Sequence, residues 1–268
     1  MRRRAKTRQS ALEIGSEARP NFGGGGFFDR LDSNAPKRRE FPFTIPAIRK
    51  FRRIEFHPAV TFFIGENGTG KSTLLEAIAI KCAFSTAGGW KRGMTDNLQP
   101  SSELHRHLTL SRRGYPSDGW FLRAESFHNV ATEIDNRGIE SGYGGKSLHA
   151  QSHGEAFLAL LTNRLQGDGI YLFDEPEAAL SPQRQLAVLT LIHRLVYHHS
   201  QLIIATHSPI LLAYPHARIY EFGEHGIREI AYQETEQYRI TKDFLNNHAR
   251  MLDLLLTEED ADLRSKER

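Results

Sequence analysis

Three short apolar runs predict buried strands, and amphipathic segments between them predict helices. The apolar runs combine β-branched and aromatic residues and are bounded by glycine or polar residues, which is typical of buried strands. They occupy residues 60–64, 170–173 and 201–205. Apolar residues at helical spacing occupy residues 71–84, 155–165 and 182–199. This alternation predicts an α/β fold with a mostly parallel central sheet and helices on both faces.

Antiparallel strands are predicted at two further places. Residues 104–110 and 120–127 have strand composition and are separated by turn-forming residues, so we expect them to form a β-hairpin. Residues 217–222 and 227–232 predict a second hairpin around two glycines. The central sheet is therefore expected to carry an antiparallel β subdomain.

Charge and composition divide the chain into three parts. Residues 1–40 contain ten basic and five acidic residues, four consecutive glycines and few aliphatic residues, which predicts a flexible basic tail. Such a tail either stays solvated without a role or contacts nucleic-acid phosphates. Residues 41–250 are expected to form the folded domain. Residues 251–268 are expected to hold the end of a last helix, which spans about 242–256, and a charged tail.

The overall composition excludes several protein classes. The 268 residues are 39% hydrophobic and carry a formal net charge of +3, as in ordinary globular proteins. No apolar run approaches the roughly 18 residues of a membrane helix, and the arginine-rich start lacks the apolar core of a secretory signal. The single cysteine, Cys82, excludes an internal disulfide and a multi-cysteine zinc site. We expect a cytoplasmic protein without a membrane segment of its own.

A glycine-rich segment between a predicted strand and a predicted helix indicates a phosphate-binding loop. Residues 65–72 match the pattern G-x-x-x-x-G-K-[ST]. The glycines allow backbone N–H groups to surround phosphate oxygens, and the helix N-terminus adds partial positive charge. Lys71 supplies a cation to the β- and γ-phosphates, and Ser72 supplies a hydroxyl to Mg²⁺. The expected nucleotide-binding residues here are Gly65, Glu66, Asn67, Gly68, Thr69, Gly70, Lys71, Ser72 and Thr73.

Two polar positions after the other buried strands complete the candidate chemistry. Asp174 ends the run at 170–173 and is expected to bind Mg²⁺ together with Ser72. Glu175 follows directly and is expected to orient and polarise the attacking water. His207 lies just after the strand at 201–205, where parallel sheets carry catalytic groups, and is expected to contact the γ-phosphate.

These motifs together resemble the ATPase heads of ABC type. In that family a Leu-Ser-Gly-Gly-Gln or -Glu signature contacts the γ-phosphate of ATP bound to a second subunit. Residues 151–155 occupy the corresponding place, with Ser152, Gly154 and Glu155 matching the signature and His153 replacing its first glycine. The resemblance implies a P-loop NTPase of the ABC-ATPase head type. It also implies that Glu175 is the catalytic glutamate and His207 the switch histidine.

Within the ABC-type ATPases, the chain most resembles the predicted ATPases of the RecF/SMC branch, which are grouped with abortive-infection ATPases. Residues 174–185, Asp-Glu-Pro-Glu-Ala-Ala-Leu-Ser-Pro-Gln-Arg-Gln, carry this likeness together with the segment around His207. The resemblance implies that residues 179–181 cross a dimer interface. The family's glutamine-bearing loop has no clear counterpart, and Glu125 or Ser126 is the candidate by position. Lys146, just before the signature, is a further candidate to reach phosphate across a dimer.

We therefore expect an ATPase that uses ATP and Mg²⁺ and closes as an ATP-dependent homodimer. The family likeness points to a process that involves nucleic acid, or a partner protein acting on it, or to defence. The alternative is the nucleotide-binding subunit of a membrane transporter, although the signature and the glutamine-bearing loop both depart from that class. A third alternative, a non-catalytic nucleotide-binding module, is opposed by the intact Glu175 and His207.

Overall fold

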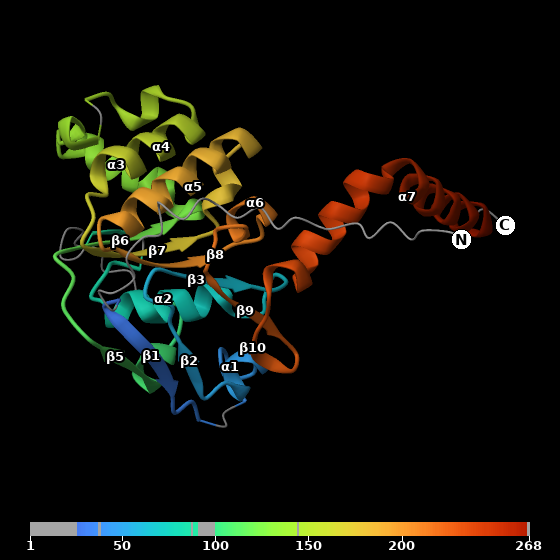
Figure 1. Cartoon of the computed structure of the whole chain (residues 1–268), viewed down its shortest axis with the longest axis horizontal. Helices are drawn as coiled ribbons and strands as arrows, with labels where there is room; N and C mark the ends of the chain where they lie inside the picture. The colour runs from blue at the N-terminus through green and yellow to red at the C-terminus, as the bar shows by residue number, and fades with distance from the viewer. Residues whose placement is uncertain (1–25, 37–38, 87, 91–99, 144, 267–268) are drawn as a thin grey trace, which may run out of the picture.

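A mostly parallel sheet runs through the middle of the protein. The computed structural model describes residues 26–36, 39–86, 88–90, 100–143 and 145–266. The sheet has seven strands in the order β10-β9-β3-β8-β7-β6-β4 (Figure 1). From β9 to β6 the neighbouring strands pair in parallel, while β10 and β4 pair antiparallel at the edges. The strands are β3 (Val60–Ile64), β4 (Gly89–Trp90), β6 (Asp118–Arg123), β7 (Gly169–Asp174), β8 (Gln201–Ala205), β9 (Arg218–Gly223) and β10 (Gly226–Glu229).

Helices cover one face of this sheet, and a helix with a second sheet covers the other (Figure 1). Helices α3, α4 and α5 lie on the first face, and α2 lies between the central sheet and the three-stranded antiparallel sheet β2-β1-β5. The other elements are β1 (Phe28–Ser33), α1 (Pro46–Lys50), β2 (Arg53–Glu55), α2 (Lys71–Lys81), β5 (Leu108–Arg112), α3 (Phe127–Asn136), α4 (His153–Arg164), α5 (Pro182–Tyr197), α6 (Pro209–Leu212) and α7 (Glu236–Lys266). Short 3₁₀ helices include η1 (Leu104–His107), η2 (Ala124–Ser126), η5 (Pro176–Ala179) and η6 (Tyr232–Glu234).

The buried strands separate two apolar cores. Side chains of successive strand residues point to opposite faces of a sheet, so Phe62 joins the core beneath α3–α5 while Phe63 joins the core around α2. Every residue of β3, β7 and β8 is buried. Continuous apolar runs are typical of parallel strands covered on both faces. The predicted α/β fold with a parallel sheet, helices on both faces and an antiparallel β subdomain is therefore confirmed.

The predicted tail at residues 1–40 is wrong at its C-terminal end. Residues 1–25 lie outside the described residues, but β1 is the central strand of the antiparallel sheet and pairs with both β2 and β5. Phe28 and Leu31 are fully buried in the core around α2. The sequence pattern does not predict this strand, because its few apolar residues stand among charged residues.

The predicted hairpin from residues 104–110 and 120–127 is also wrong. Both segments contain strands, but β5 joins the antiparallel sheet, whereas β6 lies beside β7 in the central sheet. Residue 127 begins α3, a helix that the composition did not indicate. The hairpin of β9 and β10 is confirmed. The last helix is longer than predicted, because α7 spans Glu236–Lys266 and crosses the proposed boundary at residue 250.

The burial of β1 gives a direct test of its role. Leu31→Ala is expected to lower the free energy of unfolding by about 2–5 kcal/mol, because the side chain is fully buried and leaves a cavity. Arg30→Ala is the matched control on the same strand, since Arg30 is exposed and pairs with Asp32 at the surface, and it is expected to cost about 1 kcal/mol or less. Denaturant unfolding measures both. Equal stability of the two variants would show that β1 does not belong to the core.

Candidate functional site

The loop between β3 and α2 has the backbone geometry that its glycines permit. Gly65 and Gly70 have φ angles of 139° and 97°, in the region that residues with a Cβ rarely adopt. A Cβ on Gly65 would lie 2.4 Å from the carbonyl oxygen of Phe222, and one on Gly70 would lie 3.0 Å from Ile48. The loop is therefore held tightly over the N-terminus of α2, where backbone N–H groups suit an anion.

Lys71 places a buried cation inside this loop. Its side chain is almost fully buried, and Nζ donates to the carbonyl oxygens of Gly65 at 2.7 Å and Glu66 at 2.9 Å. Burial lowers the pKa of Lys71, while the nearby carboxylates of Glu175, Asp174 and Glu177 oppose that shift. These carbonyl contacts hold the ammonium group at the loop, as the predicted role of Lys71 toward phosphates requires.

Ser72 and Asp174 meet across the gap between α2 and the end of β7. The Ser72 hydroxyl donates to Asp174 Oδ1 at 2.9 Å. Burial raises the pKa of Asp174 to about 6, although the hydrogen bond from Ser72 and the charge of Arg123 act in the opposite direction. Mg²⁺ binds oxygen ligands such as hydroxyls and carboxylates. The burial of the Asp174 charge is only partly offset by Ser72 and Arg123, so a cation would stabilise it. The residues present therefore fit the predicted magnesium position.

Arg123 is a member of the site that the sequence did not indicate. It ends β6, directly beside Asp174 in the parallel register, and its Nε lies 3.6 Å from Asp174 Oδ2. Its guanidinium also pairs with the buried Glu76 on α2 at 3.1 Å and with Glu125. Glu125 is thus linked through Arg123 to Asp174, and its candidate role for the missing glutamine-bearing loop stays a prediction. A lone arginine at a strand end carries no sequence signal.

Glu175 and His207 lie close together at the ends of neighbouring strands. Glu175 has left-handed backbone angles, φ 51° and ψ 53°, and its N–H donates to the carbonyl oxygen of Ala205 at 2.9 Å. His207 Nε2 lies 3.6 Å from Glu175 Oε1. That nitrogen is buried and has no hydrogen-bond partner among the described residues. Strained backbone of this kind is common at functional sites.

Glu177 holds the histidine segment in place. Its carboxylate accepts a hydrogen bond from the backbone N–H of His207 at 2.5 Å. The contact spans 30 residues of sequence, and Glu177 had no predicted role. In the sequence Glu177 stands out only as the second acidic residue after Asp174. Its contact with His207 can be recognised only once β7 and β8 are paired.

A cavity brings the predicted magnesium and catalytic positions together. It has a volume of about 430 Å³ and opens between the ends of β6 and β7 and the following turns. Its lining residues are Ser72, Arg123, Ala124, Glu125, Asp174, Glu175, Ala178 and Ala179. The cavity therefore brings Ser72 and Asp174, the predicted magnesium ligands, together with Glu175, the predicted catalytic glutamate.

The signature residues lie on α4 and are tied to α5. The backbone N–H and hydroxyl of Ser152 donate to Glu155 at 3.1 and 2.8 Å, and this bonding lowers the pKa of Glu155. Arg184 donates to both residues, to Ser152 at 3.4 Å and to Glu155 at 3.2 Å. A Cβ on Gly154 would lie 2.9 Å from the backbone carbonyl oxygen of Ala179 and would also displace the Arg184 guanidinium, so glycine suits this close packing. His153 begins the helix.

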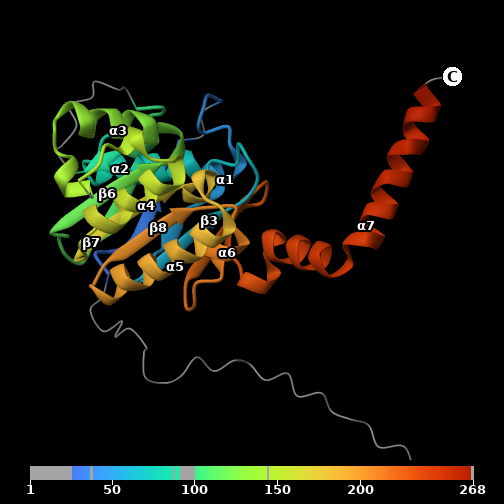
Figure 2. The same ribbon diagram turned by 90° about the horizontal axis from the view of Figure 1, so that it is seen from above.

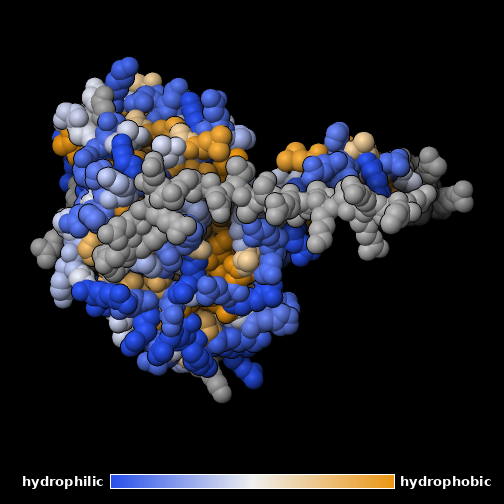
Figure 3. Space-filling model, in the orientation of Figure 1, coloured by the Kyte–Doolittle hydropathy of each residue, from blue (hydrophilic) through white to orange (hydrophobic). Residues whose placement is uncertain are grey.

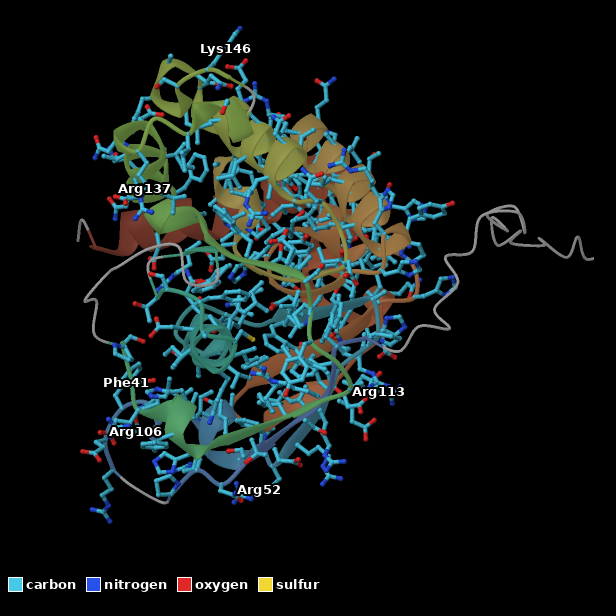
Figure 4. All side chains as sticks on the ribbon, turned by 90° about the vertical axis from the view of Figure 1, so that its left-hand side faces the viewer. Phe41, Arg52, Arg106, Arg113, Arg137 and Lys146 are labelled. Atoms are coloured by element: carbon cyan, nitrogen blue, oxygen red, sulfur yellow. The ribbon has the colours of Figure 1, made fainter. Side chains whose placement is uncertain are left out.

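Within one chain the signature is bonded to α5 rather than to the phosphate loop. Every hydrogen bond of the Ser152 and Glu155 side chains among the described residues stays within α4 or goes to Arg184. Lys146 lies at the outer end of the helical layer, on the connection from α3 to α4, and is exposed (Figure 4). Roles of Ser152, Gly154 and Lys146 toward a second subunit stay predictions.

The α/β fold carries a glycine-rich loop of the pattern G-x-x-x-x-G-K-[ST] between β3 and α2. A family described as "AAA domain, putative AbiEii toxin, Type IV TA system" matches residues 154–213, and a family described as "AAA domain" matches residues 43–109. The two matches include the phosphate loop in one case and Asp174, Glu175 and His207 in the other. A search of the curated proteins gave no match.

Solved structures similar to this chain include ATP-binding heads. One is an ATP-binding cassette of an ABC transporter, with 17% identity, a TM-score of 0.46, and coverage of 81% of this chain and 96% of that one. Another is cbiO1 from Clostridium perfringens, part of the ABC transporter complex cbiONQ, with 18% identity, a TM-score of 0.45 and coverage of 85% and 99%. A third is the SMC head domain from Thermotoga maritima, with 15% identity, a TM-score of 0.40 and coverage of 76% and 98%.

No helix in the described part of the chain combines the length and apolar character needed to cross a bilayer.

The raised pKa of Asp174 predicts a pH-dependent stability. The folded protein binds this proton more tightly than the unfolded chain, whose aspartate pKa is about 3.9. Without Mg²⁺ and nucleotide, the stability of the wild type relative to Asp174→Asn should therefore fall as the pH rises from 4 to above 6, by on the order of 2 kcal/mol. Urea unfolding at several pH values measures the difference. Asp253→Asn on the exposed part of α7 is the control, and a pH dependence equal to that of the control would contradict the burial effect.

Proposed function

We propose that this protein is a Mg²⁺-dependent ATPase whose two heads close on ATP as a homodimer. The observation that carries the proposal is the convergence of Lys71, the Ser72–Asp174 pair and the Glu175–His207 pair at one edge of the sheet. The P-loop fold supports nucleotide binding and hydrolysis. The family matches over both halves of the site agree with this assignment.

Each residue has a role that follows from its position. Lys71 and the N–H groups of the loop bind the β- and γ-phosphates, and Ser72 and Asp174 hold the metal ion. When bound, Mg²⁺ neutralises charge that develops on the phosphate oxygens. Glu175 accepts a hydrogen bond from the attacking water and orients it. The buried Nε2 of His207, beside Glu175, donates a hydrogen bond to a γ-phosphate oxygen when that region is filled.

The signature supports a site shared between two copies. Ser152 is exposed at the N-terminus of α4, and its single-chain contacts are to α5. A second head placed over the loop would bring Ser152 and the N-terminus of α4 to the far side of the nucleotide, where a helix N-terminus suits phosphate. ATP then stabilises the closed pair because it binds that state preferentially.

The process that uses this cycle is inferred from the family match alone. The description of the matched family names a toxin and a type IV toxin–antitoxin system. We assign the opening and closing of the two heads to a defence process or a process that involves nucleic acid. A partner protein that acts on nucleic acid would use the same change of shape.

Loss of the loop cation tests the phosphate site. Lys71→Ala is expected to reduce ATP binding and hydrolysis strongly, because the phosphates lose their buried cation. Calorimetric titration with Mg-ATP and phosphate release measure the two effects. Lys81→Ala, at the other end of α2, is the matched control and should behave as wild type. Normal turnover in Lys71→Ala would remove the assignment of residues 65–72 as the phosphate loop.

Two further variants test the catalytic glutamate and the shared site. Glu175→Gln keeps the shape but weakens water activation, so hydrolysis should slow about 10²–10⁴-fold while ATP binding persists and a closed dimer accumulates. Ser152→Arg adds bulk and charge at the proposed contact and should prevent closure. Light scattering with and without Mg-ATP measures assembly.

Matched controls keep this test selective. Glu133→Gln lies on α3, and Asn163→Arg lies at the exposed far end of α4, so both should hydrolyse ATP and assemble as wild type. If saturating ATP changes neither the mass of Glu175→Gln nor its radius of gyration in small-angle X-ray scattering, and Ser152→Arg hydrolyses normally, the two-headed mechanism is wrong. The protein would then be an ATPase that works with a single head.

A further inference from the structure

The C-terminal helix α7 leaves the body of the protein soon after it begins. Its 31 residues extend over about 46 Å at 1.5 Å per residue. Near its start it packs against η6 and α6. A kink at Asn247, where φ is −132° and ψ is 25°, then turns the second half, which runs away from the ATPase core (Figures 1 and 2). The backbone hydrogen bonds of a helix give it little stability in isolation, and most helices in proteins are stabilised by packing of one face. The side chains of α7 should therefore indicate what packs against it.

Large apolar side chains are exposed along α7. They recur every three or four residues on each side of the kink, so each half of α7 carries an apolar face, and the two faces together are called the stripe here. The stripe consists of Ile240, Phe244, Leu245, Met251, Leu252, Leu255 and Leu256, and Leu245 and Leu256 are 69% and 61% exposed. Figure 3 shows apolar side chains gathered on α7 away from the body. Contiguous apolar surface of this kind marks an interaction site.

An apolar groove at the base of α7 continues this stripe. It has a volume of about 390 Å³ and lies where α5, α6, η6 and the first turns of α7 meet. Leu245 belongs both to the groove and to the stripe. The other lining residues are Leu186, Leu189, Pro209, Ile210, Ala213, Tyr232, Tyr238, Thr241 and Lys242. A helix lying on the stripe would therefore reach the groove with its end.

The charges along α7 identify the occupant. Residues 236–250 contain three basic and two acidic residues, a net charge of +1, whereas residues 251–266 contain five acidic and two basic residues, a net charge of −3. An antiparallel pair of α7 helices places each acidic half beside the partner's basic half, whereas a parallel pair places the acidic halves together. We propose that α7 pairs antiparallel with α7 of a second copy and buries the stripe.

The spacing of the stripe sets the register of this pair. When the two helices cross near residue 250, Leu255 lies opposite Leu245 and Leu256 lies opposite Phe244. The acidic residues at 258–262 then follow the partner's first turns, which carry Arg239 and Lys242. The stripe is self-complementary in this arrangement, as a twofold interface requires.

Such a pair acts on the ATPase without taking part in its chemistry. Two heads joined through α7 meet at a high effective concentration, so the ATP-dependent contact forms between heads that are already linked. This consequence rests on the proposed function, but the pairing of α7 does not. The pairing needs no nucleotide, which separates it experimentally from the closure of the heads.

The test measures the oligomeric state of the full chain without nucleotide. The Lys71→Ala background excludes a contribution from bound ATP, and sedimentation velocity over a concentration series gives the dimer dissociation constant. Leu252→Glu with Leu255→Glu should weaken the dimer by at least about tenfold, because charges enter the centre of the stripe. Leu254→Glu is the matched control, since Leu254 is 55% exposed but lies off the stripe. A protein that is monomeric throughout the series, or a dimer unaffected by Leu252→Glu with Leu255→Glu, would overturn the proposal.

Charge reversal tests the antiparallel direction. Arg239→Glu with Lys242→Glu should weaken the dimer by about threefold or more, and Glu258→Lys with Asp260→Lys should do the same. Combining all four substitutions should restore the wild-type dissociation constant. A combined variant weaker than either pair would show that the helices do not pair antiparallel. If the α7 dimer forms but Glu175→Gln never closes on ATP, the proposed function fails while this proposal stands.

Discussion

The hydrogen bonds that align the ends of β3, β8 and β7 are the interaction on which the rest of the site depends. The N–H of Thr206 donates to the carbonyl oxygen of Phe63 at 3.1 Å, and the N–H of Glu175 donates to that of Ala205 at 2.9 Å. These bonds hold three strand ends level, and the phosphate loop, Glu175 and His207 each follow one of them. A slip of one residue would turn each buried side chain to the opposite face, so the two apolar cores fix the register.

The site also contains groups that a loosely packed protein would not tolerate. Lys71 and Asp174 are buried charges, and Glu175 holds a left-handed backbone conformation. Each feature costs free energy in isolation. The carbonyl bonds to Lys71, the Ser72–Asp174 bond and the strand pairing around Glu175 offset that cost. Rigid strands thereby hold reactive groups close together before any ligand arrives.

Local patterns predicted the individual elements better than their partners. The strand at 201–205 is confirmed residue for residue, and α2 and α5 begin where the glycine loop and the Ser-Pro pair predicted. The same kind of pattern wrongly paired β5 with β6 in one hairpin. The composition of a segment can predict a strand, but it does not show which strand lies beside it. Strand β1 was missed because an isolated pair of apolar residues among charges looks like a tail until β2 and β5 supply its partners.

The sequence by itself determined the glycine loop at residues 65–72, the strands that Asp174, Glu175 and His207 end or follow, and the α/β class. These features depend on local sterics, on the polarity of consecutive residues and on the period of apolar positions, all of which are visible in short windows. Only the tertiary structure showed that Arg123 lies beside Asp174, that Glu177 holds the His207 backbone and that Arg184 packs on Gly154. These contacts join residues about 30 to 50 positions apart, because strand pairing and helix packing, rather than local sequence, bring them together.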